Sequence, residues 1–91
     1  MSMSKEEAIE KARKDLAHRL GVEPGEIKEK SVEDVEFPDM ALGAGIADEM
    51  SGQMLTRGWR IRLQAGGQSF EYRANKHQVR LHNYKGQNFV I

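Results

Sequence analysis

Cysteine is absent from the 91 residues of this chain. Its absence excludes disulfide bonds, thiol nucleophiles and zinc sites built on thiolates, and it fits a reducing compartment. Runs of apolar residues long enough to span a membrane are also missing. The first residues, Met-Ser-Met-Ser-Lys-Glu-Glu, lack the apolar segment of a signal peptide. The sequence therefore predicts a single soluble domain that is cytoplasmic and has no membrane partner.

A net charge is missing as well, because 14 basic and 14 acidic residues cancel. The balance conceals an asymmetry along the chain. Residues 1–49 carry 7 Lys or Arg and 13 Asp or Glu, a net charge of −6, whereas residues 50–91 carry 7 and 1, a net charge of +6. Such an asymmetry can mark an electrostatic binding surface. It can equally stabilise the fold by placing acidic elements beside basic strands, and the sequence leaves both interpretations open.

The clearest structural pattern is a β-hairpin over residues 58–74. Apolar and polar residues alternate on both sides of Gly66-Gly67, a pair that suits a two-residue turn. Placing the turn there predicts three apolar pairs on one face: Leu63 with Phe70, Ile61 with Tyr72, and Trp59 with Ala74. It predicts two pairs on the other face: Arg62 with Glu71, and Arg60 with Arg73.

A helix is expected over residues 4–20, because Ser4 and Glu7 match a capping box and Gly21 suits a C-terminal stop. Shorter patterns predict a strand over residues 28–37, ended by Pro38, and another over residues 78–82. Residues 83–91 are expected to form a turn followed by an apolar tail.

Strand 28–37 is expected to bury Val35 and Phe37, with a bulge or twist at Val32, which is out of phase. Together the elements predict an α+β fold, with one N-terminal helix packed on a mostly antiparallel sheet of about four strands. The predicted core comprises Ile9, Leu16, Leu20, Val35, Phe37, Trp59, Ile61, Leu63, Phe70, Tyr72, Val79 and Leu81.

A series of helix, strand and hairpin motifs runs through most of the chain: residues 12–22, 31–39, 42–43, 58–61 and 70–72. In this order they resemble a family of small, uncharacterised bacterial domains that are often exported. Many of those relatives carry a Cys-Pro after the Leu-Gly and a second cysteine near the C-terminus. Here Ala44-Gly45 and His82 occupy these positions, so the chain departs from the disulfide-closed form. The layout is also similar to that of PepSY-type domains, which are associated with peptidase regulation.

Catalytic and ligand-binding signatures are sparse. No Gly-x-Ser-x-Gly occurs, Gly43-Ala44-Gly45 lacks the third glycine of a dinucleotide loop, and His77 and His82 are too isolated to indicate a metal site. We therefore expect a protein that is not an enzyme and that uses no cofactor and no metal.

Two surfaces are candidates for binding. The outer face of the sheet is expected to gather a basic cluster: Arg60, Arg62, Arg73, Arg80 and His82. Such a cluster suits nucleic acid phosphates, but no aromatic platform accompanies it, and solvated surface arginines are the simpler interpretation. The irregular segment 38–57 offers a second, methionine-rich surface: Met40, Leu42, Met50 and Met54. This segment is either a flap over one end of the core or a mobile contact surface.

Binding of a protein or peptide is the leading hypothesis, with nucleic acid as the alternative. An open sheet offers edges for an added strand, and the polarised charge suits an acidic partner. The same polarity is compatible with a monomer or a weak homodimer.

Overall fold

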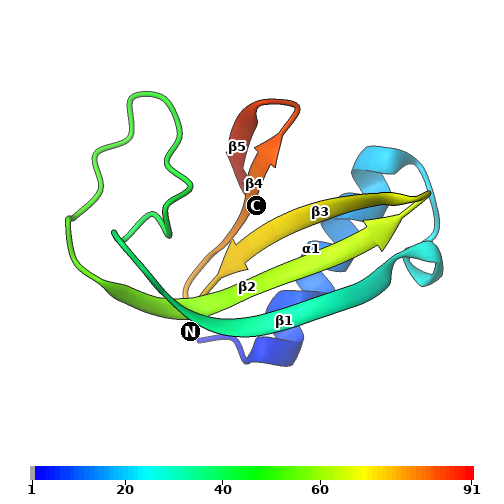
Figure 1. Ribbon diagram of the computed structural model, residues 1–91, viewed down its shortest axis with the longest axis horizontal. Helices are drawn as coiled ribbons and strands as arrows, with labels where there is room; N and C mark the ends of the chain where they lie inside the picture. Colours follow the sequence, from blue (N-terminus) through cyan, green and yellow to red (C-terminus); the bar gives the residue numbers. More distant parts are fainter. Residues whose placement is uncertain (1) are drawn as a thin grey trace.

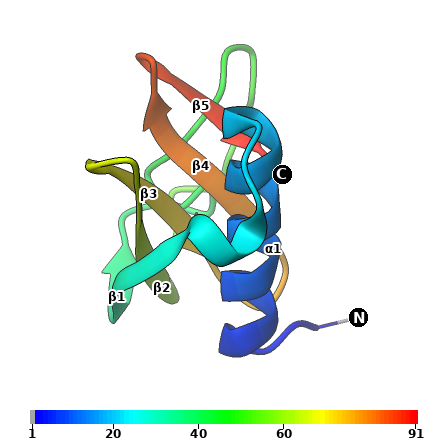
Figure 2. The same cartoon turned by 90° about the vertical axis from the view of Figure 1, so that its right-hand side faces the viewer.

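The computed structural model describes residues 2–91, which form one helix packed on a five-stranded antiparallel sheet (Figure 1). Helix α1 spans Lys5–Leu20, and a 3-10 turn, η1, spans Pro24–Glu26. The strands lie in sequence order across the sheet: β1 Lys28–Phe37, β2 Thr56–Ala65, β3 Gln68–Ala74, β4 Val79–Tyr84 and β5 Gln87–Val90. Helix α1 covers one face of this sheet (Figure 2). The α+β class is therefore confirmed.

Local sequence determines where α1 begins and ends. The hydroxyl of Ser4 accepts a hydrogen bond from the Glu7 N–H, and the Glu7 carboxylate accepts one from the Ser4 N–H. Gly21 follows the last turn in the left-handed conformation, with φ of 68°. These contacts satisfy backbone groups that a helix leaves free at its ends.

The central hairpin has the predicted register throughout. Leu63 lies opposite Phe70, Ile61 opposite Tyr72, and Trp59 opposite Ala74. Gly66 and Gly67 both have positive φ, as the two-residue turn requires. The alternating pattern thus specifies which side of β2 and β3 faces α1.

The expected count of four strands is wrong, because the C-terminal tail pairs with the sheet as β5. Strand β4 extends to Tyr84, which lies opposite Gln87 across a turn in which Lys85 and Gly86 both have positive φ. Phe89 then lies opposite Leu81 and packs against the core. Pairing in this way partly buries Phe89 and Ile91, whereas Val90 remains 50% exposed.

Strand β1 has the predicted alternation, with Val35 and Phe37 on one face and Val32 on the other. Val32 lies opposite Ile61 and therefore faces α1, whereas Val35 and Phe37 lie opposite Gly58 and Thr56 on the far face of the sheet. The register shifts between Glu29 and Ser31, before Val32. A bulge inverts the alternation of every residue that follows it.

The main core lies between α1 and the sheet. Of the predicted core, seven residues are fully buried: Leu16, Phe37, Ile61, Leu63, Tyr72, Val79 and Leu81. Five are half-buried: Ile9, Leu20, Val35, Trp59 and Phe70. Residues 38–55, here called the strap, leave β1 and return to β2 (green in Figure 1). The strap buries Ala41, Leu42 and Ala44 near Phe37.

Candidate functional site

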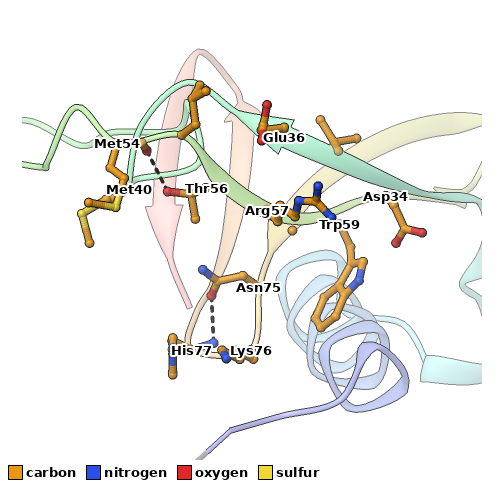
Figure 3. A pocket seen from close by; sticks show the side chains of 13 residues that line it. Asp34, Glu36, Met40, Met54, Thr56, Arg57, Trp59, Asn75, Lys76 and His77 are labelled. Carbon is orange, nitrogen blue, oxygen red and sulfur yellow. Dashed lines mark hydrogen bonds between the residues drawn. The ribbon is translucent and has the colours of Figure 1, made fainter.

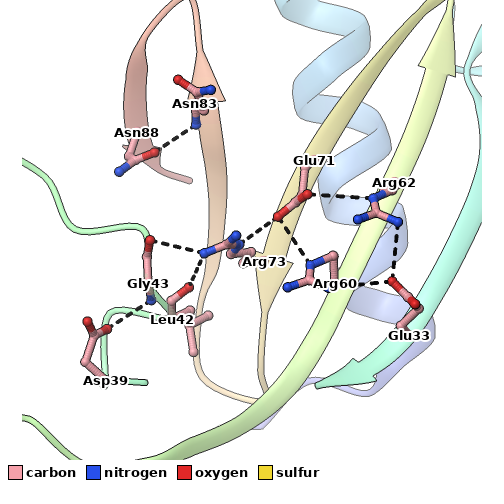
Figure 4. Close-up of polar contacts among 10 residues, drawn as sticks. All are labelled: Glu33, Asp39, Leu42, Gly43, Arg60, Arg62, Glu71, Arg73, Asn83 and Asn88. Carbon is pink, nitrogen blue, oxygen red and sulfur yellow. Dashed lines mark hydrogen bonds and ion pairs between the residues drawn. The ribbon is translucent and has the colours of Figure 1, made fainter. Parts of the chain in front are cut away.

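All five members of the predicted basic cluster belong to β2, β3 and β4, and the register places them on the face opposite α1. Carboxylates lie between the arginines (Figure 4). Glu71 lies 2.8 Å from Arg73, 3.4 Å from Arg60 and 3.7 Å from Arg62. Glu33 on β1 approaches Arg60 at 3.8 Å and Arg62 at 3.5 Å. Two carboxylates thus bridge three arginines, and Glu71 separates the Arg60–Arg73 pair of like charge.

The electrostatics of this face follow from that network. Burial alone would raise the pKa of Glu71, but the hydrogen bond from Arg73 and the charges of Arg73 and Arg60 hold it below its usual value. Burial lowers the pKa of His82, and Arg73 adds to the effect. Glu71 is therefore an ion-pair partner, while His82 favours its neutral form.

Arg80 differs from the other arginines because the strap covers it. Its side chain is 7% exposed and makes a bidentate pair with Glu49, with two N–O distances of 2.6 Å. The hydrogen bond from Arg80 is the main cause that lowers the pKa of Glu49 to about 2. The expectation that Arg80 points outward into solvent is therefore wrong, since its guanidinium lies inside the protein.

The sheet holds the strap through side-chain donors that reach its carbonyl groups. Arg73 Nη1 donates to the carbonyls of Leu42 and Gly43, each at 3.1 Å. Arg80 Nη1 donates to Ala44 at 3.2 Å, and Asn88 Nδ2 donates to Gly45 at 2.8 Å. Within the strap, Asp39 Oδ1 accepts from the N–H groups of Ala41 and Gly43. These bonds satisfy the backbone groups of the strap between Ala41 and Gly45 that lie against the sheet.

The four strap residues proposed for contact separate into three environments. Leu42 is fully buried, and Met50 is 99% exposed. Met40 and Met54, 48% and 64% exposed, line a cavity of about 820 Å³ (Figure 3). The strap thus covers part of the sheet and leaves three methionines exposed, and its role as a mobile contact surface stays a prediction.

This cavity, here called the groove, lies where the β1–β2 ribbon meets the β3–β4 turn. Apolar, charged and uncharged polar residues line it. The apolar ones are Val35, Met40, Met54, Leu55 and Trp59. The charged ones are Asp34, Glu36, Arg57 and Lys76, and the other polar ones are Thr56, Asn75 and His77. Figure 3 shows Trp59 extending from β2 toward α1, with Asn75, Lys76 and His77 on the opposite wall.

Several charges in the groove have no partner. Asp34 pairs with Lys5 at 3.2 Å. Within residues 2–91, Glu36, Arg57 and Lys76 form no ion pair shorter than 4.0 Å. The arginine network and the groove therefore differ, because the network engages its charges in ion pairs and the groove leaves three charged side chains outside ion pairs beside apolar surface.

Sequence reasoning missed the groove because its walls come from distant segments. Met54, Leu55 and Arg57 precede and begin β2, whereas Lys76 and His77 belong to the β3–β4 turn. The only signal of the groove in the sequence was the group of methionines in residues 38–57. Among residues 2–91, no three His, Asp or Glu side chains gather as a metal site would require, and no helix has the length and apolar character needed to cross a membrane.

Comparison with protein families matches residues 9–82 to a domain of unknown function, DUF8738. The matched range includes most of α1, the first three strands, the strap and the first four residues of β4. Comparisons with curated proteins and with solved structures find no match.

Proposed function

The chain belongs to the DUF8738 family of unknown function, and we propose that it is a non-enzymatic module that binds an extended segment of another protein in the groove. One observation carries the proposal. Met40, Met54 and Leu55 are 48%, 64% and 64% exposed, and they lie beside charges that have no partner in the fold. Exposed apolar surface with a polar rim is typical of interaction sites.

The chemistry of the lining favours one kind of occupant. Methionine side chains adapt to different apolar partners, and the half-buried Trp59 supplies a flat apolar wall. Glu36 lies directly opposite Arg57 in the β1–β2 register, whereas Lys76 has no carboxylate within 4.0 Å among residues 2–91. A segment that carries a large apolar side chain beside an acidic residue would complement both features.

Selection of displayed peptides tests this proposal. Random twelve-residue peptides on phage would be selected against the wild-type protein and counter-selected against Met54→Asp. Enriched peptides should be rich in large apolar and acidic residues. They should change the emission of Trp59, which is the only tryptophan of the chain and lines the groove.

Met50→Asp is the matched control, because Met50 lies in the same segment, is 99% exposed and is not part of the groove. It should retain wild-type affinity for the enriched peptides, whereas Met54→Asp should weaken it at least tenfold, roughly the effect of losing one well-packed contact. Equal binding to both variants, or no enrichment at all, would refute the groove as a peptide site.

Finer features of the assignment are proposals too. We infer a bacterial and cytoplasmic protein that is a monomer or a weak homodimer, with a layout related to PepSY-type domains. The motifs at residues 12–22 and 58–61 support the bacterial likeness, and the absence of cysteine fits a reducing compartment.

A further inference from the structure

We propose that a relay of three side chains on the arginine-bearing face, Glu49, Arg80 and Gln78, positions the Met40 wall of the groove. The inference rests on the groove as the binding site. It assigns positioning residues that do not line the groove and would not contact its occupant.

The first link joins Glu49 of the strap to Arg80 of β4. Both carboxylate oxygens of Glu49 accept hydrogen bonds from Arg80, each at 2.6 Å. The Arg80 side chain is 7% exposed and also donates to the Ala44 carbonyl. Planar, bidentate pairing in a site with little water fixes the direction of the guanidinium.

The second link runs from Arg80 through Gln78 to Met40. Arg80 Nε donates to Gln78 Oε1 at 2.7 Å, and Gln78 Nε2 donates to the Met40 carbonyl at 2.7 Å. Arg80 has only donors, so it must face the oxygen of the Gln78 amide. This leaves the NH₂ group directed at Met40.

Met40 is held at a second point. Its N–H donates to the Gly52 carbonyl at 3.0 Å, which closes the strap near the groove. A Cβ on residue 52 would lie 2.6 Å from Met40 Sδ, so glycine lets the Met40 side chain keep this position, and a larger residue would make it move. The backbone of Met40 is thus the end of the relay, and its side chain lines the groove.

This continuous chain of charge-assisted and amide hydrogen bonds is a physical route for coupling. If the relay sets the position of Met40, cutting its last link should change the groove while the Glu49–Arg80 pair stays intact. If these residues only held the strap on the sheet, losing any one hydrogen bond between strap and sheet would affect the groove to the same extent.

Gln78→Glu distinguishes the positioning of Met40 from a purely structural role. A glutamate can still accept from Arg80 but cannot donate to the Met40 carbonyl. Asn88→Asp is the matched control, since it also converts an amide to an acid. It removes the bond from Asn88 Nδ2 to the Gly45 carbonyl but keeps the bond from the Asn83 N–H to the side-chain oxygen.

Two readouts should respond to Gln78→Glu. The Kd of an enriched twelve-residue peptide should rise about tenfold, and exchange of the Met40 amide should accelerate by a similar factor. Asn88→Asp should change both by less than about twofold. Thermal denaturation checks that both variants fold.

Equal effects of the two variants on affinity and on Met40 exchange would overturn the relay. Unchanged affinity of Gln78→Glu, with peptide binding to the wild type intact, would overturn it as well. A wild type that enriches no peptide would refute the proposed function instead. Exchange of the Met40 amide would still decide whether Gln78 positions that residue.

Discussion

Gly58 lies where two strands and an aromatic ring meet. A Cβ at this position would fall far inside contact distance of the Ala74 carbonyl and 3.1 Å from Phe37 Cε2. The residue is buried in the middle of the sheet. Because both neighbours belong to packed elements, neither can move away at low cost.

Gly58→Ala should therefore reduce the free energy of unfolding by roughly 1–3 kcal/mol, the usual cost of overpacking. Chemical denaturation followed by Trp59 fluorescence measures it. Gly25→Ala is the control, since a Cβ there would meet nothing within 4 Å and the residue has no positive φ. Similar stability of the two variants would show that Phe37 and the Ala74 carbonyl relax freely.

Tyr72 connects the sheet to α1 through a single hydroxyl. Tyr72 Oη donates to Asp15 Oδ2 at 2.7 Å, and the same oxygen accepts from Arg19 Nε at 2.7 Å. Burial and the Asp15 carboxylate raise the pKa of the phenol, so it remains a donor across the accessible pH range.

Tyr72→Phe should cost roughly 1.5–3 kcal/mol of unfolding free energy, as expected for a hydrogen bond to a charged acceptor. Tyr84→Phe is its counterpart, because the Tyr84 hydroxyl makes no hydrogen bond within residues 2–91. Urea unfolding of both variants gives the comparison. A Tyr72→Phe protein as stable as Tyr84→Phe would mean that water replaces the phenol at Asp15.

At the scale of elements, the features that could be predicted are those whose contacts join residues close in sequence. The α1 caps and the β2–β3 register depend on residues close in sequence, and they could be predicted. The irregularity near Val32 could also be predicted, but not which face of β1 meets α1, because that depends on pairing with β2 across the long strap.

The contacts of the strap and the walls of the groove could not be predicted either, because they join residues far apart in the sequence. Arg80 and Glu49 are 31 residues apart, and Asn88 and Gly45 are 43 residues apart. No periodicity relates such positions. Composition did show an irregular segment rich in methionine, and that part of the candidate site could be predicted.

Docking of the strap should depend on pH through Glu49. Its pKa is about 2 in the folded protein, against an ordinary value of 4.5. A pKa that folding lowers contributes stability that is complete above the ordinary value and disappears as pH falls through the folded value. The strap should therefore loosen between about pH 4.5 and pH 2.

Methyl NMR follows this transition, with the ε-methyl of Met40 as the reporter and the exposed Met50 as the internal reference. Glu49→Gln should lose the transition and resemble the acid state at neutral pH. Asp48→Asn is a suitable control, because it removes a neighbouring charge and asparagine tolerates the positive φ of residue 48. A transition that persists in Glu49→Gln would assign it to another carboxylate.

At the scale of the whole molecule, the opposite charges of the two halves meet inside one chain. Glu33 and Glu49, from the acidic half, pair with Arg60, Arg62 and Arg80 from the basic half. Glu71, the only acid of residues 50–91, lies among three arginines. The asymmetry thus contributes to the fold, and carboxylates already engage the arginines of this face.

The wild-type protein should consequently show no amide shifts at Arg60, Arg62, Arg73 or Arg80 when titrated with short oligonucleotides at low salt. Glu71→Gln should create weak, salt-dependent shifts on this face, because it leaves three arginines with one fewer carboxylate. Glu36→Gln changes the net charge equally but lies in the groove, so it should stay silent. Wild-type shifts on the arginine face that fade as salt rises would contradict this account. They would show that phosphates compete successfully with Glu33 and Glu71 for the same guanidinium groups, and nucleic acid would then replace the peptide as the leading ligand.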